Sequence, residues 1–350
     1  MSPDLERYSC QVALPGFGEA AQQLLQHARV LVVGAGGLGC PALQYLTSAG
    51  AGTIGVADYD TVSISNLHRQ ILYNPSDTGK KKAIIACERL QKQNPGVKLV
   101  PHDLNVTSDN VLDILSQYDI VVDGTDNFET RYLLNDAAVL LNKPLVYGAI
   151  YQYEGQVAIW NVKNTDDTYT PNYRDLYPKL DATQIPNCAV GGVIPTLAGI
   201  IGCMQANEVI KYITKTGELL AGKVLIFDAQ TLQSRIIKIG AVTKTRIESL
   251  TQTVSITTIT ADALKKGLEE DKFELIDVRT VQEHDALDIG GKLIPVEDIE
   301  ENIEYFNSDK SMVLYCATGK RSAEAVKVIK QKFPWARVLS LEGGLADFAE

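Results

Sequence analysis

The segment Val30-Leu-Val-Val-Gly34-Ala-Gly36-Gly37-Leu-Gly39 decides the fold of this 350-residue chain. Its uncharged apolar start predicts a buried parallel strand, and its glycines predict a tight turn into a helix that ends near Ala49. The run Thr53 to Ala57 predicts a second strand, which is followed by Asp58. Glycines here let backbone N–H groups approach a phosphate, and a carboxylate after the second strand can accept hydrogen bonds from ribose. The segment predicts a nucleotide site, and alone it does not separate NAD from ATP.

Strand and helix patterns alternate further along the chain. Short apolar runs at residues 98–101, 120–123 and 144–147 predict strands. Helical patterns at residues 81–93 and 130–141 lie between them. This order is typical of an α/β fold, in which helices cover both faces of a doubly wound, Rossmann-like sheet.

The pattern changes to that of hairpins after residue 147. Residues 155–160 and 224–227 predict strands, and residues 233–239 alternate apolar and polar side chains as a half-buried strand does. A long helix is expected over residues 199–213. The nucleotide-binding domain is therefore predicted to contain a mixed sheet.

A change of composition after residue 240 predicts a second domain. Residues 241–255 are rich in threonine, serine and lysine, so we expect a linker between domains over residues 1–240 and 256–350. The second domain repeats the pattern of strand and helix, which predicts a small α/β fold. Its expected elements are a strand and a helix within residues 259–269, strands over residues 273–278, 312–315 and 338–341, and a helix over residues 322–332.

Charge and cysteine usage exclude several classes of protein. The chain has 33 basic and 43 acidic residues, and its longest basic run is Lys80-Lys81-Lys82. Without clustered cations, binding to nucleic acid or to a membrane surface is not expected. The six cysteines form no C-x-x-C pair, which argues against a disulfide framework and a zinc ribbon. The start of the chain lacks the pattern of a secretory signal, and the uncharged stretches 30–57 and 188–206 contain glycines and a proline, so we expect a cytoplasmic protein without membrane spans.

Three polar groups after the glycine turn favour ATP over NAD, because nucleotidyl transfer must neutralise a triphosphate and its metal. Asn66-Leu-His-Arg69-Gln70 places a guanidinium and amides in a loop, and Lys80-Lys81-Lys82 places cations at the start of a helix. Asp123-Gly-Thr-Asp126-Asn127 offers a ligand for Mg²⁺ after a buried strand. Singly, each group has an ordinary alternative: a surface salt bridge for Arg69, a solvated helix face for the lysines and an N-cap for Asp126. Together they indicate a site.

These motifs and Gly155-Gln156 resemble those of the MoeB/ThiF family, the bacterial relatives of ubiquitin-activating enzymes, over residues 4–240. The resemblance implies that the chain uses ATP and Mg²⁺ to adenylate the C-terminal glycine of a small ubiquitin-fold sulfur carrier. It implies that Arg69 and Lys82 contact the phosphates and that Asp126 binds Mg²⁺, which makes these three residues catalytic. The residues that it implies for nucleotide binding are Gly34, Gly36, Gly37, Gly39, Asp58, Asp60, Asn66, Arg69, Gln70, Lys82, Asp126 and Asn127.

The chain departs from this family at two places. The family usually has a second arginine where this chain has Cys10, and that arginine reaches ATP in the partner subunit of a dimer. The family also has a zinc site of two C-x-x-C pairs, whereas Asn172-Tyr-Arg-Asp175 stands here at the first pair and no cysteine lies between residues 203 and 316. The resemblance implies a homodimer, and the loss of all four ligands implies that no zinc is bound.

Cys316 opens the loop Cys316-Ala-Thr-Gly-Lys-Arg321, which leads from a strand into a helix. The N–H groups of such a loop, with its two cations, favour the thiolate that a persulfide carrier needs. This loop, Leu275-Ile-Asp277-Val-Arg279 and Leu341-Glu-Gly-Gly344 together resemble a rhodanese domain. The resemblance implies that Cys316 is the catalytic cysteine of sulfur transfer, with Arg321 beside it.

Cys188 is a second candidate for covalent chemistry. It lies in Asn187-Cys188-Ala-Val-Gly-Gly and matches a family position that can link to the activated carrier or to the sulfur donor. An equal alternative is a small apolar residue of the core, for which cysteine is common.

The two resemblances form one expected reaction sequence. The N-terminal domain would activate a carrier that ends in Gly-Gly as an acyl-adenylate. A Cys316 persulfide, loaded by a cysteine desulfurase or from thiosulfate, would convert it to a thiocarboxylate for molybdopterin, thiamine or tRNA thiolation. Two alternatives stay open. The departure at Cys10 and the missing zinc ligands suggest a non-catalytic scaffold that binds the carrier, and the glycine turn and Asp58 alone suggest an NAD-dependent oxidoreductase with a rhodanese-like appendage.

Overall fold

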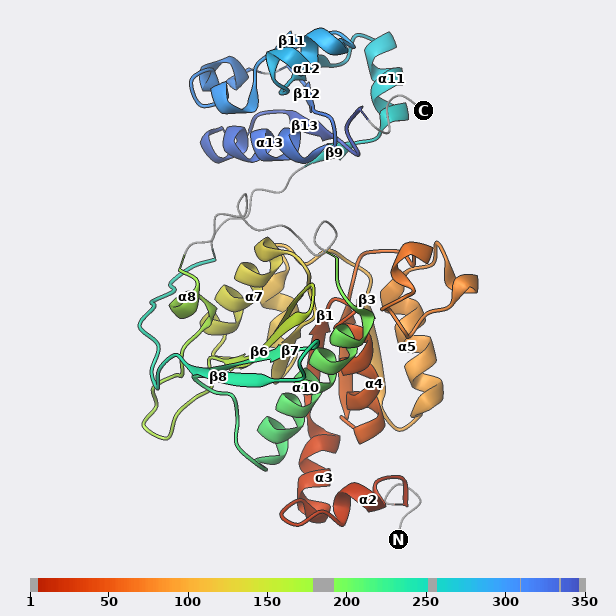
Figure 1. Ribbon diagram of the computed structural model, residues 1–350, viewed down its shortest axis with the longest axis vertical. Helices are drawn as coiled ribbons and strands as arrows, with labels where there is room; N and C mark the ends of the chain where they lie inside the picture. The colour runs from red at the N-terminus through yellow and green to blue at the C-terminus, as the bar shows by residue number, and fades with distance from the viewer. Residues whose placement is uncertain (1–5, 179–191, 251–256, 309, 334, 346–350) are drawn as a thin grey trace. The chain divides into compact units, whose positions relative to one another are not determined.

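The computed structural model describes residues 6–178, 192–250, 257–308, 310–333 and 335–345. The chain divides into two compact units, Met1–Thr251 and Gln252–Glu350, which Figure 1 draws from red to blue. Each unit has its own sheet and its own apolar core. The second unit begins within the segment that the sequence predicts as a linker, and the domain boundaries themselves stay predictions.

The first unit is built on an eight-stranded sheet with the order β3-β2-β1-β4-β5-β6-β7-β8. Its strands are β1 (Arg29–Val33), β2 (Thr53–Ala57), β3 (Lys98–His102), β4 (Ile120–Asp123), β5 (Leu145–Tyr151), β6 (Glu154–Trp160), β7 (Lys223–Asp228) and β8 (Ser234–Lys238). Strands β1 to β5 pair in parallel and β5 to β8 pair antiparallel, which confirms the predicted doubly wound, mixed sheet. Successive strands are added to one side of β1 as far as β3 and then to its other side from β4 onward, so the strand order reverses between β1 and β4. In sheets of this kind, ligands bind at the carboxyl ends of the strands at such a point.

Helices cover both faces of this sheet (Figure 1). The α-helices described in this unit are α2 (Ser9–Val12), α3 (Gly18–His27), α4 (Gly39–Ala49), α5 (Lys82–Gln93), α6 (Val111–Ser116), α7 (Phe128–Leu140), α8 (Tyr173–Leu176) and α10 (Pro195–Thr214), of which α2 lies away from the sheet. Successive side chains of β1 enter different cores: Val30 and Val32 pack with residues of α4, α5 and α10, whereas Leu31 and Val33 pack with residues of α6 and α7. Because both faces of the strand are buried, its sequence is a continuous apolar run.

The structure corrects the expected burial of β8. All five of its side chains are exposed, so the predicted half-buried strand is wrong in this respect. Among the described strands β8 pairs only with β7, and it lies at the edge of the sheet. An alternating pattern gives the orientation of side chains, and it does not tell whether another layer covers either face.

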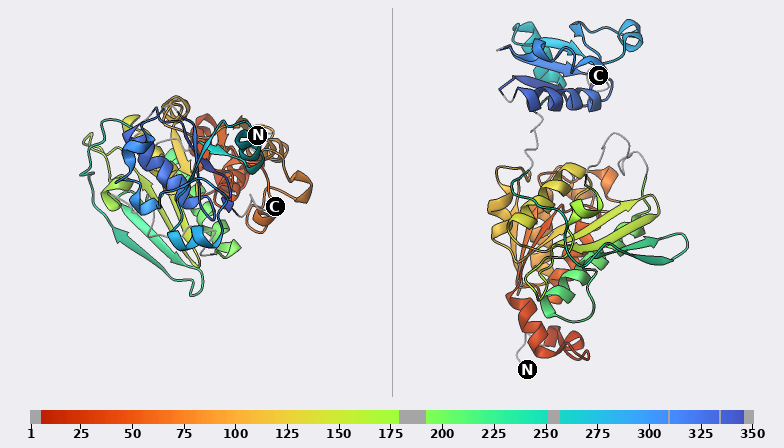
Figure 2. Two further views of the ribbon diagram at one scale, coloured as in Figure 1. Left: turned by 90° about the horizontal axis from the view of Figure 1, so that it is seen from above. Right: turned by 90° about the vertical axis from the view of Figure 1, so that its left-hand side faces the viewer.

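The second unit contains a five-stranded parallel sheet with the order β11-β10-β12-β13-β9. The strands are β9 (Thr258–Ile259), β10 (Glu274–Asp277), β11 (Lys292–Leu293), β12 (Met312–Tyr315) and β13 (Val338–Leu341), and the helices are α11 (Ala261–Glu269), α12 (Val281–Ala286) and α13 (Lys320–Lys332). Figure 2 shows α13 on one side of this sheet and α11 on the other, in agreement with the two cores that they enter. Helix α13 begins at Lys320 and not at Ser322 as predicted, so its first turn includes the end of the cysteine loop.

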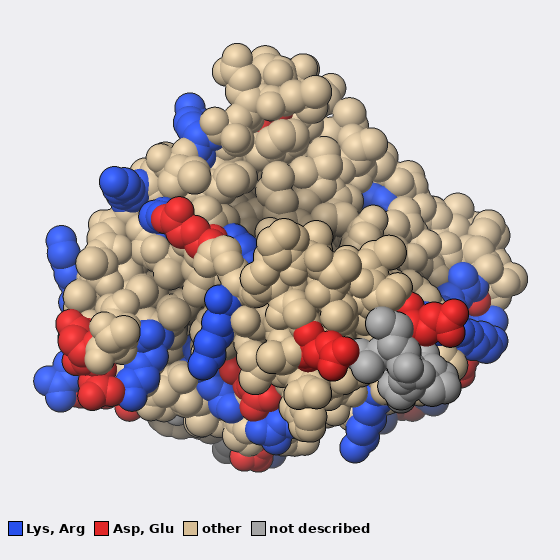
Figure 3. Space-filling model, turned by 90° about the horizontal axis from the view of Figure 1, so that it is seen from below, with Lys and Arg blue, Asp and Glu red and all other residues tan. Residues whose placement is uncertain are grey.

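The surface carries charges of both signs. On the face shown in Figure 3, lysine and arginine are interspersed with aspartate and glutamate, mostly toward the lower margin, and neither sign forms a continuous block. Within the part of the chain that the structure describes, no helix has both the length and the apolar character needed to cross a bilayer. The expectation that the chain binds no nucleic acid stays a prediction.

Candidate active sites

The glycine turn packs backbone against backbone. Gly34 has φ +92°, and a Cβ on Gly34 would lie 2.6 Å from the carbonyl oxygen of Gly124, in the loop after β4. A Cβ on Gly39 would lie 1.8 Å from the carbonyl oxygen of Gly34, so the first turn of α4 closes directly onto the loop. Gly34, Gly36 and Gly37 line a cavity at the carboxyl ends of the strands, whereas Gly39 serves this close approach and does not line it.

Asp58 lies beside the turn at the end of β2. Its Oδ2 accepts a hydrogen bond of 2.7 Å from the N–H of Ala35, and its Oδ1 accepts one of 2.8 Å from the N–H of Asp60. Burial raises the pKa of Asp58 above the ordinary aspartate value. The predicted ribose ligand therefore lines the same cavity as the turn and is oriented by backbone donors.

Lys82 and Arg69 bring two cations to the cavity. Lys82 is 4% exposed at the start of α5, and its Nζ lies 2.9 Å from Oδ2 of Asp60. Arg69 donates to Oδ1 of Asn66 at 3.0 Å, and its side chain lies against Gly37, where a Cβ would come within 3.3 Å of Arg69 Cδ. Asn66 does not itself line the cavity and instead orients Arg69. A cation at a helix start opposes the helix dipole, which an anion bound there would compensate.

Asp126 and Asn127 follow β4 and have different roles. The side chain of Asn127 accepts from the N–H of Thr130 at 2.8 Å and caps α7. The alternative that Asp126 is the N-cap is therefore wrong. The Asp126 carboxylate lines the cavity and makes no hydrogen bond or ion pair with any residue of the described ranges. A carboxylate without a protein partner beside two cations fits a ligand of Mg²⁺ bound to phosphate.

The cavity has a volume of about 320 Å³. Gln70, 4% exposed, lines it, and its Oε1 has no hydrogen-bond partner within the described part of the chain. An unpaired buried acceptor is costly, so this oxygen fits a donor supplied by a ligand. The donors, acceptors and cations around the cavity thus fit a nucleoside triphosphate.

The cavity also contains an aromatic group that the sequence analysis did not single out. Tyr147 and Tyr177 both donate from their hydroxyls to Oε1 of Gln156, at 3.2 and 3.3 Å. Tyr173 lies between them, with ring centroids 5.4 and 5.0 Å away. Gln156 belongs to a motif that the sequence analysis noted. No local sequence pattern links it to Tyr147 of β5 or to Tyr173 and Tyr177, which lie in and directly after α8.

The sulfur of Cys316 lies at the end of β12 in a residue that is 1% exposed. Burial acts to raise the pKa of Cys316, but hydrogen bonds from the backbone N–H groups of Ser322 and Thr318 and from the Ser322 hydroxyl outweigh it, so the pKa lies below that of an ordinary thiol. The Ser322 Oγ lies 3.7 Å from the sulfur. Gly344 makes room for the loop, because a Cβ there would lie 2.4 Å from the carbonyl oxygen of Cys316. The loop stabilises a thiolate, as its sequence predicts.

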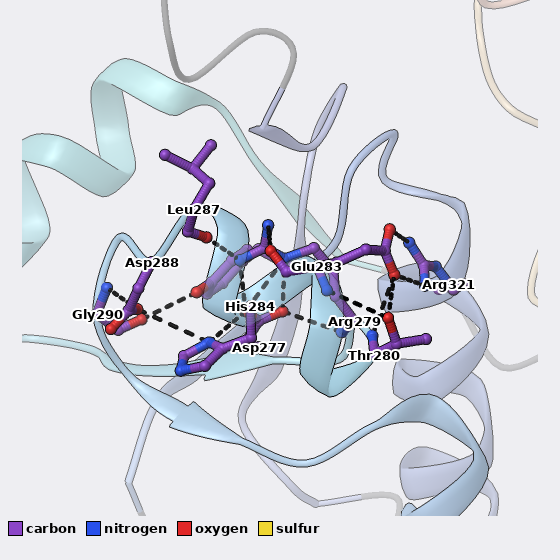
Figure 4. A network of polar contacts seen from close by, with 10 residues as sticks. Asp277, Arg279, Thr280, Glu283, His284, Leu287, Asp288, Gly290 and Arg321 are labelled. Carbon is purple, nitrogen blue, oxygen red and sulfur yellow. Dashed lines mark hydrogen bonds and ion pairs between the residues drawn. The ribbon is translucent and has the colours of Figure 1, made fainter.

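Arg321 has an acidic partner that the sequence analysis missed. Its two terminal nitrogens each lie 2.6 Å from an oxygen of Glu283, whose carboxylate also accepts from Thr280 (Figure 4). Behind this pair, Arg279 binds Asp277 in the core of the unit, as Figure 4 also shows. The sequence Thr280-Val-Gln-Glu283 has the spacing of a capping box, which could have placed Glu283 in the first turn of α12. It does not indicate the pairing of Glu283 with Arg321.

The remaining predicted positions have different outcomes. Cys188 lies outside the described residues. Cys10 is exposed on α2, and the nearby Arg7 donates to the carbonyl oxygen of Gln93. At the predicted place of the missing zinc ligands, Asp175 instead binds the chain near Thr243. In the described ranges, no three or more His, Cys, Asp or Glu side chains gather as metal ligands would, and the expectation that zinc is not bound stays a prediction.

The fold and the two sites are those of an adenylyltransferase joined to a rhodanese-like sulfurtransferase unit. The comparison with protein families agrees, since the ThiF family matches residues 8–265 and the rhodanese-like domain matches residues 260–350. The chain belongs to the ThiF family.

Several proteins are similar to this chain. It is 40% identical to "Probable adenylyltransferase/sulfurtransferase MoeZ" of Mycobacterium tuberculosis, over 99% of this chain and 93% of that protein. It is 49% identical to "Sulfur carrier protein adenylyltransferase" of Thermus thermophilus, over 65% of this chain and 84% of that one. The crystal structure of E. coli MccB matches with a TM-score of 0.62 at 19% identity, covering 74% of this chain and 76% of that chain, and has a similar fold over that share.

Proposed function

We propose that this protein adenylates the C-terminal glycine of a small ubiquitin-fold sulfur carrier with ATP and then delivers sulfur to it from Cys316. The observation that carries the proposal is the presence in one chain of a cation-lined cavity, in which Asp126 has no partner among the described residues, and of a stabilised thiolate at Cys316. The names of the similar proteins from M. tuberculosis and T. thermophilus support both halves of it.

Adenylation activates a carboxylate, which is a poor electrophile. A carboxylate oxygen of the carrier bonds to the α-phosphorus of ATP, and the bond from that phosphorus to the bridging oxygen breaks, so that pyrophosphate leaves with the electron pair. Arg69 and Lys82 stabilise the negative charge that grows on the phosphates, and Asp126 would hold the Mg²⁺ that shields them. Lys82 exchanges Asp60 for a phosphate when the nucleotide binds.

Sulfur transfer uses the thiolate of Cys316. This thiolate bonds to the outer sulfur of the donor, which forms a persulfide as the donor's remaining group leaves. The terminal sulfur of the persulfide then attacks the acyl carbon, and AMP leaves with the electrons of the broken carbon–oxygen bond. A second thiol attacks the resulting acyl disulfide and becomes disulfide-bonded to Cys316, so that the thiocarboxylate is released. A covalent role for Cys188 stays a prediction.

Further expectations belong to the same proposal. The protein acts as a homodimer in the cytoplasm, without zinc, and serves molybdopterin, thiamine or tRNA thiolation. The donor of sulfur is a cysteine desulfurase or thiosulfate. The alternative of a non-catalytic scaffold differs in one property, because a scaffold binds the carrier without turning over ATP.

ATP–pyrophosphate exchange tests the proposal. The purified protein is incubated with Mg²⁺, ATP and labelled pyrophosphate, with and without a ubiquitin-fold carrier that ends in Gly-Gly. We expect exchange that depends on the carrier and is lost when the carrier lacks its last glycine. Carrier binding without exchange would support the scaffold, and binding of NAD in preference to ATP would support the oxidoreductase.

A further inference from the structure

The carboxylate of Glu283 occupies both terminal nitrogens of Arg321. Nη1 lies 2.6 Å from Oε2 and Nη2 lies 2.6 Å from Oε1, which is the bidentate arrangement of a strong guanidinium–carboxylate pair. The pair is half-buried, with 31% of the Arg321 side chain and 38% of the Glu283 side chain exposed. Two of the five N–H donors of Arg321 are therefore engaged by a carboxylate, and its positive charge is paired.

Glu283 is itself held in place. Its Oε2 accepts from the N–H and the hydroxyl of Thr280, at 3.1 and 3.0 Å, and the hydroxyl of Thr280 accepts from the N–H of Glu283 at 3.3 Å. Arg279 donates to the Glu283 carbonyl oxygen at 3.1 Å. The hydrogen bond from Arg321, with those from Thr280, lowers the pKa of Glu283 to about 2, so the carboxylate is charged at neutral pH. Figure 4 shows this arrangement between α12 and the start of α13.

Of the two cations of the loop, Arg321 is the one that interacts with the reacting sulfur. It carries the last position of the loop, its backbone N–H donates to Cys316, and its guanidinium also interacts with the sulfur. The other cation of the loop, Lys320, is exposed at the first position of α13. Because Glu283 neutralises one of the two cations of this loop, only the charge of Lys320 remains uncompensated by it for a ligand.

The effect of the Glu283–Arg321 pair on donor binding depends on the charge of the donor. Thiosulfate carries two negative charges: the Cys316 thiolate bonds to its outer sulfur, the sulfur–sulfur bond of thiosulfate breaks, and sulfite leaves with the electron pair. A persulfide group carries at most one negative charge: the thiolate bonds to its outer sulfur, the sulfur–sulfur bond of the donor breaks, and the donor's thiolate leaves with the electron pair. Binding of a dianion requires cations that are not compensated by carboxylates of the protein.

We propose that Glu283 is a specificity-determining residue, which selects against dianionic sulfur donors and in favour of persulfides by neutralising Arg321. The inference rests on the proposed sulfur transfer by Cys316 and names the donor class for that site. It predicts a gain of function, because removal of the Glu283 charge releases Arg321 for the sulfonate group of thiosulfate.

The test compares the wild-type full chain with Glu283→Gln, which keeps the size of the side chain and removes its charge. Persulfide formation on Cys316 is followed by mass spectrometry, and turnover is followed with cyanide as sulfur acceptor. Thiosulfate and glutathione persulfide are the two donors. We expect the KM for thiosulfate to fall about fivefold in Glu283→Gln, the size of effect that a half-exposed ion pair produces. We expect the rate with glutathione persulfide to change less than twofold.

Two further variants separate specificity from general damage. Glu300→Gln removes an exposed carboxylate in the same unit and should leave both donors unaffected. In Glu283→Gln/Arg321→Gln the gain with thiosulfate should disappear, because the released guanidinium is absent. An unchanged or higher KM for thiosulfate in Glu283→Gln, with persulfide formation intact in the wild type, overturns the role of Glu283 alone. Failure of the wild type to form a persulfide from either donor overturns the proposed sulfur transfer as well.

Discussion

The carboxylate of Asp175 accepts a hydrogen bond of 2.6 Å from the hydroxyl of Thr243, 68 residues further along the chain. The same carboxylate accepts from the N–H of Lys244 at 2.8 Å and from the hydroxyl of Thr245 at 2.7 Å. The amide of Asn172 donates to the Thr243 hydroxyl at 2.9 Å. One acidic side chain at α8 therefore fastens the segment that follows β8 to the first unit.

Removal of this link should destabilise the first unit in a pH-dependent way. Burial acts to raise the pKa of Asp175, but the hydrogen bonds from Thr243, the N–H of Asn172, Thr245 and Lys244 outweigh it and lower the pKa. A lowered folded-state pKa stabilises the protein above the ordinary aspartate value of about 3.9, and this stabilisation is lost as the pH falls through the folded-state pKa. We expect Asp175→Ala to lower the free energy of unfolding by at least about 1 kcal/mol at pH 7.

Urea unfolding of the first unit at pH 7 and at lower pH measures this effect. The difference between the wild type and Asp175→Ala should shrink as the pH falls. Asp113→Ala, at an exposed site on α6, is the matched control and should unfold as the wild type does. A difference that is independent of pH would contradict the role of the ionised carboxylate.

Lys82→Ala should weaken the binding of ATP. The variant loses a cation at the cavity and leaves the carboxylate of Asp60, now 2.9 Å from Nζ, unpaired beside the phosphates. Loss of a charge-assisted hydrogen bond of about 1.5–3 kcal/mol corresponds to a rise in the KM for ATP of roughly 10- to 100-fold. Pyrophosphate exchange at varied ATP measures it. Lys92→Ala, on the exposed face of α5, should have the normal KM.

Asp126→Ala should abolish carrier-dependent exchange, because Asp126 is the carboxylate of the cavity that has no partner among the described residues. The variant should still bind ATP in the absence of Mg²⁺, since Arg69 and Lys82 are intact. Equilibrium binding of ATP with and without Mg²⁺ separates the contribution of the metal from that of the two cations. Exchange at the wild-type rate and at the wild-type Mg²⁺ concentration would rule out Asp126 as the metal ligand.

Cys316→Ala should separate the two reactions. Cys316 lies in the second unit, and the nucleotide cavity is lined by residues of the first. We expect normal pyrophosphate exchange together with complete loss of thiocarboxylate formation, measured by the mass of the carrier. A wild-type yield of thiocarboxylate would mean that the sulfur reaches the carrier by another route.

Ser322→Ala should raise the pKa of Cys316. The Ser322 hydroxyl lies 3.7 Å from the sulfur, and the hydrogen bond between them lowers the pKa of Cys316, so its loss favours the protonated thiol. The rate of alkylation by iodoacetamide should reach half its maximum at a higher pH than in the wild type. Thr318→Ala is the matched control, since Thr318 acts on the sulfur through its backbone N–H and should keep the wild-type profile.

The sequence predicted the elements whose two faces are both buried. β1, β2 and β4 are short, mainly apolar runs because helices cover each side of the sheet. The glycine turn is recognisable because the approach of Gly34 to Gly124 leaves no room for a Cβ. The exposure of β8 was not predictable in this way, because it depends on which elements lie beside a strand and not on the strand itself.

The same distinction holds for the sites. Asp58 follows directly after a predicted strand and Lys82 lies at the start of a predicted helix, so their common location was predictable from the topology. Arg69 lies in the loop between them, and its place at the cavity was expected from the family resemblance. The pairing of Glu283 with Arg321 spans 38 residues and joins two separate helices, and no local spacing indicates it. The position of Arg321 beside Cys316 was therefore predicted from the sequence, whereas the neutralisation of its charge by Glu283 was not.

The near-complete burial of Cys316 has a consequence for timing. On the proposed function, a sulfur atom carried by a residue that is 1% exposed can be reached only by a group narrow enough to enter the loop, such as a small donor or the C-terminal end of the carrier. The bound sulfur is then transferred when an acceptor that can reach into the loop arrives.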